Sequence, residues 1–149
     1  MSYKIILMNK KGIFLSILLL VIIIISVGAV CASDKSVDIG GISFNIPGDY
    51  DENPNLEIKD YVKTHGNTTL KENHKSFCDK DGKYLGITVE EYNPPVTLKD
   101  LKISGDEKTI GSVKGIFFYD GLNFFKFEKD NKIVTISYDE ESIAQNVIN

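Results

Sequence analysis

The sequence predicts an α+β domain, one antiparallel sheet with two helices packing on it, behind an N-terminal membrane-spanning or signal helix. Three observations indicate this fold class. An almost uninterrupted apolar run covers residues 13–30. Short segments of alternating apolar and polar residues follow, separated by glycine- and asparagine-containing turns, as is typical of β-hairpins. Two further segments, 54–65 and 139–148, carry apolar residues at helical spacing.

The apolar run has the features of a targeting segment. Three lysines and no acidic residue precede it, which is the charge pattern of a signal sequence. As a helix the run spans roughly 27 Å, about the thickness of the hydrocarbon core of a bilayer. Residues 1–32 are therefore expected to be a signal anchor or a signal peptide cut after Ala32, and a lipid on Cys31 is the third interpretation. Each of these places the rest of the chain outside the cell, either held in the cell membrane or secreted.

The exported part is predicted to be one acidic domain at 37–149, joined to the apolar run by a linker at 33–36. After residue 32 the chain has 14 lysines and 21 acidic residues, a formal charge of −7. Such a domain is a poor candidate for nucleic acid, whose phosphates require clustered cations. The chain contains no arginine, so it lacks the side chain that grips carboxylates and phosphates with two parallel hydrogen bonds. The membrane is expected to be a partner only through residues 13–30.

Strand signals recur along this domain. Four turn signals separate its alternating segments: Gly40-Gly41, residues 79–83, Asp120-Gly121 and Asp130-Asn131. The predicted strands are 37–39, 42–46, 75–78, 84–92, 107–110, 113–119, 122–129 and 133–138. Thr97 and Asp100 are expected to cap one short turn between two of these hairpins.

The two predicted helices have capping signals as well as periodicity. Asn53 and Pro54 are the residue types of a helix cap and of a first helical position. The apolar stripe of the helix at 54–65 would consist of Ile58, Tyr61, Val62 and His65. The C-terminal helix has acidic residues in its first turn, where they interact favourably with the helix dipole.

The segment GIFFYDGLNFFKF, residues 115–127, predicts a hairpin that is apolar on both faces. With Asp120-Gly121 as a two-residue turn, Phe117 lies opposite Phe124. Because a sheet with one wet face alternates instead, this hairpin is expected to be covered on both sides by the two helices.

The alternative for this hairpin is that one aromatic face stays open as a binding platform for a sugar, peptide or lipid. In the predicted register this face would carry Phe118, Phe125 and Phe127, which are the candidate ligand-binding residues.

Candidate chemistry is sparse, and no enzyme, metal site or cofactor is predicted. The sequence contains none of the common nucleophile, zinc-protease, phosphate-loop or dinucleotide motifs. His74 and Cys78 would lie roughly 13 Å apart on a strand, too far for a catalytic pair. Cys78 is expected to be a small buried apolar residue, with an intermolecular disulfide as the alternative. The acidic turn at 79–82 has its glycine too early for an EF-hand calcium loop, so it is predicted to be a turn.

Asn67-Thr68-Thr69 is an acceptor pattern for N-linked glycosylation, which matters in an exported domain. The asparagine directly follows Gly66, the glycine that is expected to end the first helix. The pattern therefore indicates an exposed loop and a possible glycan on Asn67.

Gly41–Tyr50, Thr109–Gly115 and Lys132–Ile136 resemble the short exported or membrane-anchored proteins of methanogenic archaea that have no assigned function. The order of elements is similar to that of PsbP/Mog1-like domains, which implies an antiparallel sheet between helices. Neither resemblance implies catalytic residues. The sequence thus predicts a non-catalytic cell-surface domain that binds an envelope protein or a glycan, with a small extracytoplasmic enzyme or a divalent-cation binder as the alternatives.

Overall fold

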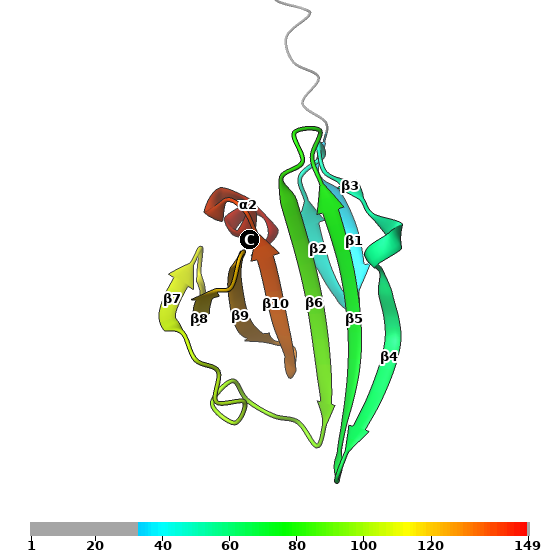
Figure 1. Cartoon of the computed structure of the whole chain (residues 1–149), viewed down its shortest axis with the longest axis vertical. Helices are drawn as coiled ribbons and strands as arrows, with labels where there is room; N and C mark the ends of the chain where they lie inside the picture. Colours follow the sequence, from blue (N-terminus) through cyan, green and yellow to red (C-terminus); the bar gives the residue numbers. More distant parts are fainter. Residues whose placement is uncertain (1–32, 149) are drawn as a thin grey trace, which may run out of the picture. The chain divides into compact units, whose positions relative to one another are not determined.

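The computed structural model describes residues 33–148, which form ten strands, one short 3-10 turn and one α-helix (Figure 1). The strands are β1 (Lys35–Ile39), β2 (Ile42–Ile46), β3 (Asp51–Glu52), β4 (Ile58–His65), β5 (Thr68–Cys78), β6 (Tyr84–Asn93), β7 (Asp106–Ile110), β8 (Val113–Tyr119), β9 (Asn123–Lys129) and β10 (Lys132–Tyr138). The 3-10 turn η1 is Pro54–Leu56, and helix α2 is Glu141–Ile148. The part of the chain described is therefore a mostly antiparallel β domain with one C-terminal helix.

Eight of the strands form one antiparallel sheet in the order β3-β5-β6-β10-β9-β8-β7, and β4 pairs with β5 beside β3. β3 and β4 share one edge of the sheet: Asp51 lies opposite Cys78 at one end of β5, and His65 lies opposite Thr68 at the other end. β1 and β2 form a separate hairpin. Among the described strands, β7 forms one edge of the sheet, and β3 and β4 together form the other.

The core lies on one face of the large sheet, here called the inner face. The β1–β2 hairpin and α2 pack on this face, with α2 against β2, β7 and β10. Alternate residues of the central strands point into this core, including Val89, Val134 and Phe127, which are all at most 1 % exposed. Neither a helix nor a second sheet covers the outer face, within the residues that the structure describes.

The prediction of a helix at 54–65 is wrong. Asn53 does cap a turn, since its side-chain oxygen accepts a hydrogen bond from the backbone N–H of Asn55 at 3.2 Å, but this turn ends at Leu56. The chain then continues as β4, whose predicted helical stripe is exposed: Tyr61 is 53 % and Val62 57 % exposed. Aromatic and β-branched residues suit a strand, and pairing with β5 satisfies the backbone of this segment.

The predicted register of the aromatic hairpin is wrong by one residue. Asp120, Gly121 and Leu122 form a three-residue loop, so that Tyr119 lies opposite Asn123 and Phe117 opposite Phe125. The shift changes the cross-strand partner of every residue in the hairpin. Because side chains alternate between the faces of a strand, it also changes which side chains of the two strands share a face. Among residues 33–148, no helix covers the outer face of this hairpin, because the one α-helix, α2, packs on the inner face.

Several other predictions are confirmed. The C-terminal helix forms at 141–148, and Asp130 and Asn131 both have positive φ in the two-residue turn between β9 and β10.

The expected linker at 33–36 is shorter than predicted. β1 starts at Lys35, so the second half of the expected linker already belongs to a strand. The predictions for residues 1–32, including the apolar helix at 13–30, lie outside the described residues. No helix among residues 33–148 is long and apolar enough to span a membrane.

Candidate ligand-binding site

The segment 94–105, between β6 and β7, lies against the outer face of the sheet. The backbone N–H of Leu98 donates a 2.7 Å hydrogen bond to the carboxylate of Glu128 on β9. Ile133 on β10 points to the outer face, opposite Glu128 and Glu90, and is only 1 % exposed although it does not belong to the core cluster. This burial is expected where the segment covers the sheet.

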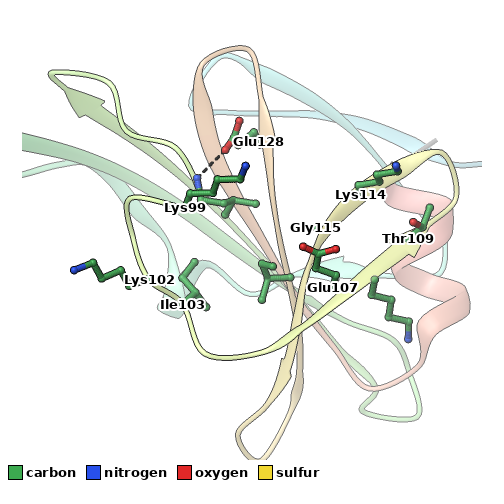
Figure 2. A pocket seen from close by; sticks show the side chains of 11 residues that line it. Lys99, Lys102, Ile103, Glu107, Thr109, Lys114, Gly115 and Glu128 are labelled. Carbon is green, nitrogen blue, oxygen red and sulfur yellow. Dashed lines mark hydrogen bonds between the residues drawn. The ribbon is translucent and has the colours of Figure 1, made fainter.

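A pocket of about 770 Å³ lies between this segment and strands β7 to β9 (Figure 2). Its volume is in the range of small-molecule sites. The lining residues are Leu98, Lys99, Lys102, Ile103, Glu107, Lys108, Thr109, Lys114, Gly115, Ile116 and Glu128. Leu98 and Ile103 from the segment and Ile116 from β8 are its apolar, half-buried side chains. The pocket therefore joins an apolar surface to a charged margin.

The segment is shaped by a reciprocal hydrogen-bond pair. Thr97 donates from its backbone N–H (2.8 Å) and from its hydroxyl (2.7 Å) to the carboxylate of Asp100, and the backbone of Asp100 in turn bonds to the carbonyl of Thr97. The backbone bond from Thr97 is the largest cause that lowers the pKa of Asp100. This confirms the turn expected at Thr97 and Asp100. Directly after it, Lys102 has a φ of +49°, a left-handed conformation that is uncommon for lysine.

The charges of the pocket lining are mainly positive. Four of its residues are lysines and two are glutamates, on a domain whose formal charge is −7. The ammonium of Lys108 is already engaged, because it pairs with Glu141 of α2 and lies 4.7 Å above the ring of Phe117. The other three lysines make no ion pair with any described residue: Lys99, Lys102 and Lys114.

The three free lysines come from different sides of the pocket. Lys99 and Lys102 extend from the segment, and Lys114 lies on the opposite side of the view in Figure 2. Glu107 lies on the sheet side of the pocket, opposite Ile116 in the β7–β8 register. Glu128, the second carboxylate, is engaged by the Leu98 amide. The lining therefore presents three ammonium groups beside an apolar floor, together with the carboxylates of Glu107 and Glu128.

A second pocket, of about 480 Å³, lies between the β1–β2 turn and β4, and its charges are balanced. It is lined by four lysines and four acidic residues, most of them in ion pairs. The pairs are Lys71–Asp60 at 2.8 Å, Lys75–Glu57 at 3.6 Å and Lys132–Glu91 at 3.6 Å. A charged ligand would have to break these pairs, so the first pocket is the better candidate site.

The structure does not bring the three candidate aromatic residues together. Phe125 and Phe127 lie in the core, 0 % and 1 % exposed, and they cannot form an open platform. Phe118 lies on the outer face, where it is half-buried and stacks on Phe124. The one-residue error in the hairpin register had placed Phe118 and Phe125 on the same face.

The two candidate nucleophile partners, His74 and Cys78, are also apart. Both lie on β5, four residues from each other on an extended strand, and Nδ1 of His74 is 2.9 Å from the hydroxyl oxygen of Thr88. Burial lowers the pKa of His74. Cys78 is a half-buried free thiol at the end of β5. These positions give the pair no shared hydrogen bond.

The acidic turn after β5 uses its first carboxylate internally. Asp79 accepts hydrogen bonds from the backbone N–H groups of Asp81 and Lys83, both at 2.8 Å, and Gly82 has a φ of +82°. This confirms a turn at 79–82. Among residues 33–148, no group of three or more histidine, cysteine or acidic side chains is close enough to hold a metal ion.

Asn67 lies in the exposed two-residue turn between β4 and β5, so the acceptor pattern is at a hairpin tip.

The sequence analysis did not predict the pocket residues of the segment 94–105. A usable signal was Leu98-Lys99-Asp100-Leu101-Lys102-Ile103, in which lysines recur three residues apart beside apolar residues.

Comparison of the chain with protein-family models, with curated proteins and with solved structures finds no match.

Proposed function

We propose that the chain is a non-catalytic binding domain, displayed outside a membrane by its N-terminal apolar segment, whose ligand occupies the pocket between residues 94–105 and strands β7 to β9. The observation that carries this proposal is the lining of the pocket. Three lysines without ion-pair partners among the described residues line it beside an apolar floor, on a domain that is otherwise acidic. Ligand pockets typically combine an apolar lining with a small number of polar or charged groups that orient the ligand.

The first described residues and Asn67 lie at opposite ends of the domain. The ammonium of Lys35, near the start of the described chain, lies 3.1 Å from the carboxylate of Asp51. Asp51 on β3 lies opposite Cys78 in the strand register, at one end of β5. The turn that carries Asn67 lies at the other end of this eleven-residue strand, roughly 36 Å away. A glycan on Asn67 would thus be attached far from the junction with the apolar segment.

The location is tested by cysteine labelling of the full chain in intact cells. Lys80 lies in the exposed turn after β5, so Lys80→Cys in a Cys31→Ser, Cys78→Ser background offers one accessible thiol. A membrane-impermeant maleimide should label this variant in intact cells, and the same background with Lys80 retained is the matched control. Labelling that requires permeabilised cells would show that the domain is inside.

Ligand binding in the pocket is tested with 8-anilinonaphthalene-1-sulfonate, a dye with an aromatic body and one sulfonate. We expect saturable fluorescence enhancement with the wild-type chain and a weaker one with Ile103→Ser, which removes part of the pocket floor. Val62→Ser, an exposed residue on β4, is the matched control. Equal enhancement in all three proteins would place dye binding elsewhere and contradict the assignment of this pocket.

A further inference from the structure

We propose that the pocket binds anionic amphiphiles, molecules with one carboxylate or phosphate head and a short alkyl chain. This inference rests on the proposed function, because it names the ligand class of the same site. The head would be held by the ammonium groups of Lys99, Lys102 or Lys114, and the chain would lie over the apolar floor formed by Leu98, Ile103 and Ile116.

The charge of the head follows from what the pocket leaves unpaired. Lys99, Lys102 and Lys114 have no ion-pair partner among the described residues, and these three ammonium groups outnumber the two carboxylates of the lining, Glu107 and Glu128. A neutral head would leave these ammonium groups without a counter-charge, and a cationic head would be repelled by them. Anions are also repelled by the rest of this acidic domain, so this pocket is where an anion is favoured.

The number of charges on the head is limited by Glu107. Its carboxylate lies on the sheet side of the pocket, opposite Ile116, and makes no ion pair with a described residue. A second anionic group extending towards the floor would meet this carboxylate. A ligand with one anionic end and an apolar body avoids that contact, whereas a dicarboxylate of similar length does not.

The chemistry of lysine leaves the type of anion open. An ammonium acts as a point charge with three rotatable donors, without the fixed two-bond geometry of arginine. Carboxylate and phosphate heads are therefore both accepted. The apolar floor supplies the rest of the affinity, because each buried methylene strengthens binding by about fourfold.

The experiment is a titration of the full chain in lipid nanodiscs, with empty nanodiscs subtracted. The probes are hexanoate and hexyl phosphate, with propanoate and inorganic phosphate as heads without a long chain, adipate as the dicarboxylate and hexyl glucoside as the neutral amphiphile. Calorimetry gives the affinities. Isoleucine methyl NMR locates the binding, because Ile103 and Ile116 line the pocket and Ile58 on β4 is a distant reference.

We expect hexanoate and hexyl phosphate to bind about tenfold or more tightly than propanoate, adipate and hexyl glucoside. The methyl signals of Ile103 and Ile116 should shift saturably while that of Ile58 stays. Raising the salt concentration from about 50 mM to about 500 mM should weaken binding of the two anionic amphiphiles, since exposed ammonium groups are screened.

Matched triple variants separate local charge from total charge. Lys99→Gln, Lys102→Gln and Lys114→Gln together remove the three free ammonium groups and should weaken hexanoate binding by about tenfold or more. The control triple Lys59→Gln, Lys63→Gln and Lys80→Gln removes the same charge from exposed positions outside this pocket and should leave the affinity unchanged.

The outcomes distinguish the two proposals. Hexyl glucoside binding as tightly as hexanoate, with shifts at Ile103 and Ile116, would overturn the anionic ligand class and leave the pocket as a binding site. Equal weakening by both triple variants would likewise show that the head is not held by the pocket lysines. Absence of pocket shifts with every probe at millimolar concentration would overturn both the ligand class and the proposed site.

Discussion

Phe118 on β8 and Phe124 on β9 stack across the hairpin on the outer face, with ring centroids 5.0 Å apart and ring planes 5° from parallel. Both rings are half-buried, although neither helix nor sheet covers this face in the described part of the chain. The two rings shield each other from water. Where the sequence predicted a helical cover, the outer face thus has this stacked pair and the segment 94–105.

The stack predicts how much each face of the hairpin contributes to stability. Phe118→Ala should lower the free energy of unfolding by about 2 kcal/mol, because it removes a half-buried ring and exposes the ring of Phe124 that stacks on it. Phe125→Ala, at a fully buried core position, should cost about 4 kcal/mol. Urea denaturation at equilibrium measures both. Equal losses for the two variants would mean that something covers the outer face as completely as the core.

Gly115 on β8 predicts a steric limit between β8 and β9. A Cβ atom there would overlap the backbone oxygen of Lys126 and the ring of Phe125. The backbone oxygen belongs to the neighbouring strand and cannot rotate away, so Gly115→Ala should lower the free energy of unfolding by about 2 kcal/mol or more. The control is Ser112→Ala, an exposed position before the same strand, which should change it by less than about 0.5 kcal/mol. Thermal unfolding of both variants checks this, and an unchanged Gly115→Ala midpoint would contradict the close strand approach.

The predictions from sequence succeeded where the signal was local. Asp130-Asn131 is a turn because these two residue types tolerate the left-handed conformation that a two-residue hairpin requires. The strand at 42–46 was predictable because strict alternation buries Ile42, Phe44 and Ile46 on one face.

The failures arose where tertiary contacts decide. The spacing of Ile58, Tyr61 and Val62 fits a helix, but pairing with β5 overrides it, and these side chains stay exposed. The Asp120-Gly121 pair marks a turn without fixing its length, and adding Leu122 to the loop shifts the register by one residue. The pocket depends on Leu98 meeting Glu128, thirty residues further along the chain, for which no local pattern exists.

His74 predicts a loss of stability in acid. Burial lowers the pKa of this imidazole in the folded protein, so between the folded and unfolded pKa values the unfolded chain binds more protons. The contribution of His74 is complete above the unfolded pKa of about 6.5 and is lost as the pH falls from there through the folded pKa. His74→Gln keeps a hydrogen-bonding partner for Thr88 without titrating in this range, so it should reduce the difference in unfolding free energy between about pH 8 and about pH 5.

The matched control for this pH effect is His65→Gln, at the exposed end of β4. His74 is retained in that variant, so the acid-dependent loss should remain. Denaturant titrations at the two pH values measure the difference. If the unfolding free energy of His74→Gln fell between the two pH values by as much as that of the wild type, other groups would cause the loss of stability in acid.

Lys102 predicts opposite effects on stability and on binding. Its φ of +49° costs roughly 1 kcal/mol for a residue with a Cβ atom, whereas glycine adopts this conformation freely. Lys102→Gly should therefore raise the free energy of unfolding by up to about 1 kcal/mol and weaken hexanoate binding, because it also removes one of the free ammonium groups of the pocket. Lys102→Gln separates the two causes: it keeps the strained backbone, so its stability should match the wild type, and it loses the charge, so its binding should be as weak as that of the glycine variant. Denaturation and calorimetry on the same three proteins provide the comparison. If Lys102→Gly gains stability and retains full affinity, the strained lysine serves neither the pocket nor its ligand.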